Sequence, residues 1–158
     1  MKITVTGFLE NDRNQISNLI EYCANTLMPE IANEFVIDVR ATRNDDYEAV
    51  VEVDELDRGL KHPRLFNIFI DSKSILDENE MFTSIAHEMV HVKQYALNEL
   101  CQRDGYMSYK RKRFYYDTAT LAEYYNFPWE IEAYGLEKAL YYGWKQNCKA
   151  LELFSSLA

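Results

Sequence analysis

The chain has 158 residues, of which 47% are apolar, and this suits a single domain over residues 1–158 with one buried core. Its 17 basic and 26 acidic side chains give a net charge of −9, and the acidic excess falls in the first half. Proteins that coat DNA or anionic membranes carry a basic surface, so this balance argues against both classes, although a local basic patch is still allowed.

The first half of the chain alternates between one helix and several strands. Residues 12–28 repeat apolar side chains every three or four positions, which predicts a helix with one buried face. Residues 35–41 and 47–53 alternate apolar and polar side chains, as half-buried strands do, and the turn-forming residues 44–46 between them favour an antiparallel hairpin. Residues 65–70 are almost continuously apolar, which predicts a third strand buried on both faces.

The second half contains two longer helices. One begins near Asp77 and continues to about Cys101, and the other begins at Pro128, which suits a first helical turn, and ends near Asn147. Between them, residues 102–127 form a long excursion with a short hairpin. This order predicts an α+β fold, in which a mixed or antiparallel sheet of about three to four strands packs against the N-terminal helix and these two helices.

The first of these helices carries His87-Glu88-Met89-Val90-His91, which matches the HExxH pattern. Histidines four residues apart lie on one helix face, so both imidazoles can bind one metal ion, while the glutamate between them can reach a metal-bound water. Winding the helix at about 100° per residue places the apolar side chains on the face opposite His87 and His91. Two surface histidines on an amphipathic helix would produce the same separation of faces.

The third metal ligand has to come from elsewhere, because a catalytic zinc site usually has three protein ligands and one open position. No histidine follows His91, and His62, beside Pro63, fits a loop better than a ligand. On the last helix Glu132 lies among small and apolar residues, whereas Glu130 lies on the opposite, charged face. A lone buried carboxylate is unfavourable, so Glu132 should have a cation partner, either a metal ion or an arginine. We therefore favour Glu132 over Glu130 as the ligand.

The cellular compartment is indicated by the cysteines and the N-terminus. Cys23, Cys101 and Cys148 are widely spaced and form no CxxC pair, which suits a reducing compartment. The N-terminus lacks the long apolar region of a signal peptide, and no stretch approaches the roughly 18 apolar residues of a membrane-spanning helix. We expect a cytoplasmic protein with no membrane partner and no removable pro-segment.

The HExxH helix followed by Pro128-Trp129-Glu130-Ile131-Glu132-Ala133 resembles the small gluzincin-type zinc metallopeptidases. Among them the chain is most similar to short HExxH proteins encoded by bacteriophages, and more remotely to proteases that cleave phage or stress-response repressors. The similarity covers about residues 65–145. It implies a minimal zincin-like fold, Zn²⁺ bound by His87, His91 and Glu132, and Glu88 as the general base. A phage-encoded protein of this kind would act in the host cytoplasm.

One position departs from the pattern of the larger gluzincins. Many of them have an aspartate four residues after the glutamate ligand, which orients a histidine, but that position is Leu136 here. The outward-facing ring nitrogens of His87 and His91 would then need other partners, such as a backbone carbonyl.

The reaction that the resemblance implies is hydrolysis of a peptide bond by a metal-activated water, with Glu88 moving the proton to the leaving amine. A second donor must stabilise the oxyanion, and Tyr95 lies on the right face of the HExxH helix. The other candidates are the tyrosines of the excursion: Tyr106, Tyr109, Tyr115, Tyr116, Tyr124 and Tyr125.

By resemblance, an edge strand within residues 35–70 would hold an extended peptide or protein substrate, and residues 102–127 would determine specificity. The acidic residues of 45–57 would lie beside the substrate-binding cleft that this strand would form. We therefore expect a substrate that is not strongly acidic.

Residues 109–116 support an alternative function. Here Lys110, Arg111, Lys112 and Arg113 are flanked by aromatic residues, a composition that can bind phosphates and stack on bases. The chain would then be a nucleic-acid-associated protease, or a catalytically inert zincin-fold protein that acts through interactions. The same residues also suit a solvated strand edge whose charges discourage aggregation, and we favour that interpretation.

Overall fold

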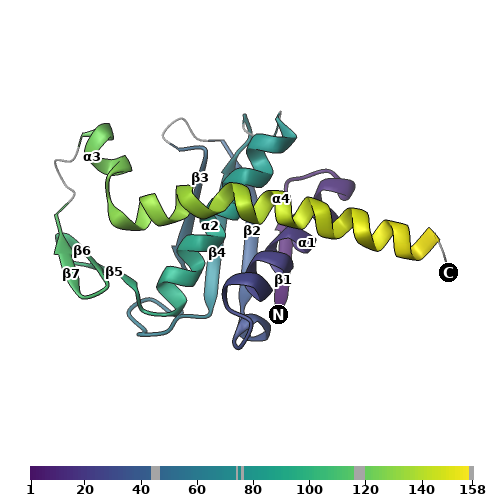
Figure 1. The fold of residues 1–158 in the computed structure, drawn as a ribbon. Coiled ribbons are helices and arrows are strands. Elements are labelled where there is room, and N and C mark those ends of the chain that lie inside the picture. Colours follow the sequence, from purple (N-terminus) through teal and green to yellow (C-terminus); the bar gives the residue numbers. More distant parts are fainter. Residues whose placement is uncertain (44–46, 74, 76, 116–119, 157–158) are drawn as a thin grey trace.

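The computed structural model describes residues 1–43, 47–73, 75, 77–115 and 120–156. Its main body is a four-stranded sheet with α1 (Glu10–Leu27) and α2 (Glu78–Ala96) packed on one face. The long helix α4 (Pro128–Ser156) lies across α1 and α2, so the body has three layers (Figure 1). This arrangement confirms the α+β class expected from the order of the elements.

The sheet is mixed and has the strand order β1-β2-β4-β3. Strands β1 (Lys2–Thr6), β2 (Val36–Thr42) and β4 (Leu65–Asp71) are parallel, and β3 (Ala49–Val53) pairs antiparallel with β4. The predicted hairpin between residues 35–41 and 47–53 is therefore wrong, and its expected turn, residues 44–46, lies outside the described residues. Alternation identifies a strand but not its neighbour, and β4, the strand with the most buried residues, occupies the position between the other two.

Only one face of β4 is fully covered. Phe66, Ile68 and Ile70 are buried against the helices, whereas Leu65, Asn67 and Phe69 on the other face are partly exposed. The expectation that this strand is buried on both faces is wrong, because the helices of the body gather on one side of the sheet (Figure 1). The resulting order leaves β3 at an edge, next to α2.

Helix α2 begins where the sequence indicates and ends earlier. The Asp77 side chain accepts hydrogen bonds from the backbone N–H groups of Asn79 and Glu80, which caps the first turn. The helix ends at Ala96 rather than near Cys101, because Asn98 adopts a positive φ of 58° and the chain enters β5 at Leu100. Helix α4 instead continues past its predicted end near Asn147 to Ser156.

The excursion between the two long helices forms a second, three-stranded antiparallel sheet of β5 (Leu100–Arg103), β6 (Tyr106–Tyr109) and β7 (Lys112–Phe114). A short helix follows, α3 (Leu121–Tyr125), and the only other helical element described is the 3₁₀ turn η1 (Ala32–Glu34). The small sheet lies at the end of the molecule that contains the start of α4 (Figure 1). Within the described residues, no helix combines the length and apolar character needed to cross a membrane.

The turn between β1 and α1 depends on Gly7, which has a φ of +85°. A Cβ added there would lie 2.8 Å from the Cβ of Ala41 on β2, whereas Gly59, with a φ of +87°, has open space around it. We expect Gly59→Ala to lower the free energy of unfolding by about 1 kcal/mol through backbone strain alone, and Gly7→Ala by about 2 kcal/mol or more. Urea denaturation of both variants measures the difference, and equal losses would contradict the predicted contact with β2.

Candidate metal centre

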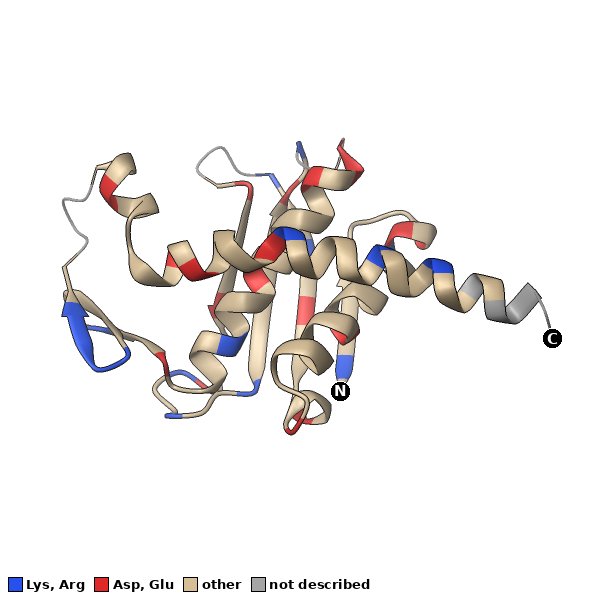
Figure 2. Ribbon diagram, in the orientation of Figure 1, with Lys and Arg blue, Asp and Glu red and all other residues tan. Residues whose placement is uncertain are grey.

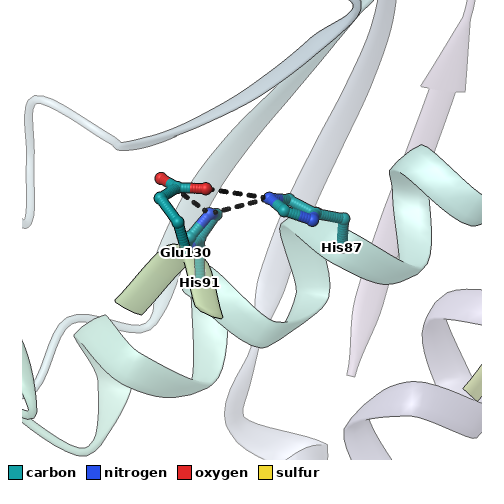
Figure 3. A group of neighbouring side chains, drawn as sticks. All are labelled: His87, His91 and Glu130. Carbon is teal, nitrogen blue, oxygen red and sulfur yellow. Dashed lines mark hydrogen bonds and ion pairs between the residues drawn. The ribbon is translucent and has the colours of Figure 1, made fainter. Parts of the chain in front are cut away.

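Two helices bring three potential metal ligands together. His87 and His91 project from α2 and Glu130 from the first turn of α4, and one ligand atom of each lies within 4.8 Å of the others (Figure 3). The Nε2 atoms of the two histidines are 3.1 Å apart, and the Glu130 carboxylate oxygens lie 3.3 Å from Nε2 of His87 and 3.6 Å from Nε2 of His91. All three side chains are buried. This group could hold a metal ion.

The other ring nitrogen of each histidine is bound to a side-chain oxygen. Nδ1 of His87 lies 2.9 Å from a carboxylate oxygen of Glu137, and Nδ1 of His91 lies 2.8 Å from the amide oxygen of Gln94. Both oxygens are acceptors, so each Nδ1 carries a proton and donates it. The partners of the two Nδ1 atoms are thus side-chain oxygens and not the backbone carbonyl that the sequence suggested. With Nδ1 protonated, the lone pair of each neutral imidazole is on Nε2, which faces the centre of the group.

The donor set fits a cation. Two Nε2 lone pairs and a carboxylate converge at one buried point, and Oε2 of Glu130 makes no hydrogen bond within the described part of the chain. Acceptors that face one another without a proton or a cation between them repel, and a buried carboxylate without a partner is costly. Two histidine nitrogens and one carboxylate are also a ligand set that zinc adopts in catalytic sites.

The shifted pKa values of the metal-free group also indicate that a positive charge is favoured at its centre. Burial alone would lower the pKa of His91, but the Glu130 carboxylate and the charge of Glu88 raise it to about 9. Burial alone would raise the pKa of Glu130, but the neighbouring imidazoles of His87 and His91 lower it to about 2. A proton on the histidines therefore supplies positive charge at the point that a metal ion could occupy.

Glu88 lies between the two histidines in the sequence and is buried beside them. The backbone N–H of Val51 on β3 donates to its carboxylate, which ties α2 to the edge of the sheet. Burial raises the pKa of Glu88, and the neighbouring Glu130 charge acts in the same direction, while the histidines oppose both. A cavity of about 890 Å³ opens beside His87 and Glu88, so this part of the site is reached from outside.

Glu132, the ligand favoured from the sequence, lies in a different environment. Its carboxylate accepts hydrogen bonds from Tyr109 at 2.7 Å, Gln94 at 2.9 Å and Lys93 at 3.0 Å. The structure thus places Glu132 outside the group and brings Glu130, expected to be solvated, to His87 and His91 instead. The expectation that a buried carboxylate here needs a cation partner is correct, but the cation is Lys93 rather than a metal ion or an arginine.

The error comes from the rotational position of α4. Gly135 and Ala139, which defined the expected apolar stripe, are exposed. The buried stripe instead follows the large aromatic residues and the residues spaced three or four positions from them: Trp129, Glu130, Ala133, Glu137, Leu140, Tyr141 and Trp144. Aromatic side chains bury the most apolar area, so their spacing was the better guide to the inward face, and it would have indicated both Glu130 and Glu137.

The remaining candidates from the sequence are spread over the molecule. His62 lies in the loop before β4, where Nδ1 contacts the Ala96 carbonyl at 3.1 Å, and it is outside the group. Tyr95 packs between the two apolar clusters and lines a second cavity of about 550 Å³, not the cavity beside Glu88. Two tyrosines contact the site: the Tyr134 ring meets the His87 ring edge-on at 4.5 Å, and the hydroxyl of Tyr124 on α3 hydrogen-bonds Glu130. Tyr116 lies outside the described residues.

The basic run 110–113 forms the turn between β6 and β7 and the start of β7, at one end of the molecule (Figure 2). Lys110 and Arg111 adopt positive φ values of 45° and 68°, as a tight two-residue hairpin turn requires. Lys110 lies over the Tyr109 ring, and Arg113 lies over the Tyr106 ring. Tyr106 and Tyr109 are thus paired with cations of the same sheet, and β7 is an edge strand that carries charge.

Metal binding should depend on Glu130 rather than on Glu132. Purified protein supplied with Zn²⁺ should bind one ion per chain, and Glu130→Gln should lower the affinity by more than about 100-fold because a charged ligand is lost. The near-isosteric Glu132→Gln should still bind one ion per chain. Elemental analysis and competition with a chelator measure both quantities, and loss of the site only in Glu132→Gln would restore the sequence-based assignment.

Metal affinity should also fall in acid. Because the pKa of His91 is about 9 in the metal-free protein, Nε2 must lose a proton before it can bind a metal ion. At pH 7, Zn²⁺ binding should release at least one proton, and the affinity should rise about tenfold per pH unit from pH 7 and level off above pH 9. Calorimetry in buffers of different ionisation enthalpy counts the protons, and a pH-independent affinity would contradict the proposed competition.

Comparison of the chain with models of known protein families, with characterised proteins and with solved structures found no match. The interpretation of the site therefore rests on its geometry and on the HExxH motif.

Proposed function

We propose that this protein is a zinc-dependent peptidase in which His87, His91 and Glu130 hold the metal ion and Glu88 is the general base. The observation that carries the proposal is the position of Glu88. It is a buried carboxylate one residue from a metal ligand, hydrogen-bonded to the open edge of a sheet and next to a cavity. A site that only stored or structurally bound a metal ion would not need this carboxylate.

The ligand set favours zinc among the common metals. Magnesium and calcium prefer oxygen ligands, whereas two imidazoles and one carboxylate match the catalytic zinc sites that keep a fourth position for water. When bound, the ion would polarise a carbonyl group and lower the pKa of water. His87 and His91 would be held in the required tautomer by Glu137 and Gln94.

Glu88 would move the proton during hydrolysis. As the water oxygen adds to the peptide carbonyl carbon, the Glu88 carboxylate takes up the water proton, and it then donates that proton to the nitrogen as the C–N bond breaks. Burial raises the pKa of Glu88, which brings a carboxylate closer to the basicity that this two-way transfer requires.

Tyr124 is our candidate for the group that stabilises the oxyanion. Its side chain lines the cavity together with His87 and Glu88, and its hydroxyl reaches Glu130. A phenol that is near the ligands and open to the cavity can donate to a carbonyl oxygen that acquires negative charge. Tyr95, the candidate from the HExxH helix, lines the other cavity.

The open edge of β3 would bind the substrate backbone. Glu48 accepts from the Asp71 N–H and the Asp54 N–H donates to Leu65, so the even-numbered residues of this segment pair with β4. The backbone groups of Ala49, Val51 and Val53 therefore point away from the sheet. An extended peptide could pair with the groups of Ala49 and Val53 and with the Val51 carbonyl, next to the N–H that Val51 already donates to Glu88.

The charge of the cavity indicates which substrates would be disfavoured. Besides Glu88 and Glu137, its lining includes Glu48, Asp71, Asp77 and Glu80, against one basic residue, Lys73. This supports the expectation that the substrate is not strongly acidic.

Replacement of Glu88 should separate metal binding from catalysis. Glu88→Gln keeps the shape and is not a ligand, so it should bind Zn²⁺ with an affinity within about threefold of the parent. It should cleave denatured casein or host-extract proteins at least about 100-fold more slowly, the scale of general-base effects. Fragment analysis by mass spectrometry measures the rate, and Glu80→Gln, which changes another carboxylate of the cavity, is the control.

The outcome also distinguishes the alternatives. Cleavage that survives in Glu88→Gln would rule out the proposed base. A parent protein that binds zinc without cleaving any of these substrates would instead favour an inert interaction protein. Salt-sensitive binding of single-stranded DNA that disappears when residues 110–113 are neutralised would favour the nucleic-acid-associated function.

A further inference from the structure

Gln94 has only one orientation that satisfies its neighbours. The side chain is completely buried, and its amide nitrogen donates to the Trp129 carbonyl at 3.0 Å and to Glu132 at 2.9 Å. Both of these partners are acceptors, so the nitrogen must face them and the oxygen must face Nδ1 of His91 at 2.8 Å. A rotation of the amide by 180° would place its oxygen against two acceptors and its N–H group against another donor.

Glu132 is the charged partner that fixes this orientation. The Trp129 carbonyl belongs to the backbone of α4, and Glu132, three residues later on the same helix, supplies the second acceptor. The Glu132 carboxylate is itself held by donors from two other elements, Lys93 on α2 and Tyr109 on β6. It cannot turn away from Gln94 without breaking these bonds.

We propose that Glu132 is a positioning residue for the metal centre: it orients Gln94, which in turn fixes the proton of His91 on Nδ1 and directs Nε2 toward the metal ion. This inference rests on the proposed metal centre and assigns a role to the residue that the sequence suggested as a ligand. Tyr109 connects the small sheet β5–β7 to the same chain of bonds, so the docking of that sheet contributes to the orientation of His91.

The test is a double-mutant cycle on zinc affinity. Glu132→Leu removes the acceptor at similar size, and Gln94→Leu removes the amide, so each should weaken Zn²⁺ binding by about 10- to 100-fold. Because Glu132 acts through Gln94, the double variant should bind no more than about threefold more weakly than Gln94→Leu alone. Glu132→Gln keeps an acceptor oxygen for Gln94 and should therefore recover most of the affinity that Glu132→Leu loses. Affinities come from competition with a chromophoric chelator.

A second readout does not depend on metal. In the metal-free protein, the Nδ1–H proton of His91 should give a downfield, slowly exchanging NMR resonance, which Glu132→Leu and Gln94→Leu should lose. Glu99→Gln is the matched control, because Glu99 binds Lys93 at 2.5 Å, as Glu132 does at 3.0 Å, but Gln94 donates to Glu132 and not to Glu99. It should keep both the resonance and the affinity.

Two results would contradict the inference. Unchanged affinity and an intact His91 resonance in Glu132→Leu would overturn it, and so would a loss in the double variant equal to the product of the two single losses. If Glu132→Leu does not fold, the comparison of the double variant with Gln94→Leu still decides. If the parent protein binds no zinc, the proposed function fails, and the NMR resonance alone decides whether Glu132 orients His91.

Discussion

The structure depends on the contact between α2 and α4, which buries two carboxylates against two histidines. Glu130 and Glu137 are seven residues apart on the inner face of α4, and His87 and His91 are four residues apart on α2. Each histidine would lose favourable hydration on burial, and each carboxylate would lose more, so neither helix could bury this face alone. The helices compensate each other only in the register observed, with a proton or a cation at the centre.

Aromatic packing on both sides of the group holds that register. Toward the C-terminal end of α4, Trp144 and Tyr141 pack on Phe82 of α2 with ring centroids 5.1 and 6.3 Å apart, and the Tyr141 hydroxyl donates to Asn79. At the other end, Trp129 stacks on Phe127 at 4.4 Å and meets Phe114 of β7 edge-on at 5.3 Å. A rigid α4 is thus fixed on both sides of the metal centre, and the polar residues between them have little freedom to rearrange.

The difference between local spacing and contacts between distant segments explains which features could be predicted from the sequence. The HExxH helix, its Asp77 cap and the strands β2, β3 and β4 follow from local spacing, and local spacing is what a sequence displays directly. The neighbours of β3 and the rotation of α4 are set by contacts between distant segments. Alternation in residues 47–53 is the same whether β3 pairs with β2 or β4, and small residues such as Gly135 and Ala139 gave no sign that Trp129 and Trp144 determine the buried face of α4. No strand was predicted at β1, where only Ile3 and Val5 are apolar and neither is fully buried.

The two glutamates at the start of α4 show why burial alone does not identify a ligand. Glu130 is buried and Glu132 is partly buried, and the pKa of each is lowered to about 2. They differ in what surrounds them. Glu132 is met by an ammonium, an amide and a phenol, so its oxygens already have donors, whereas one oxygen of Glu130 has no donor among the described residues and faces two imidazole nitrogens that can act as acceptors. A buried carboxylate is a candidate metal ligand when the protein provides no donor or cation for one of its oxygens. By that criterion, the donors around each oxygen distinguish Glu130, the proposed ligand, from Glu132, and the sequence could supply this count only once the rotation of α4 was known.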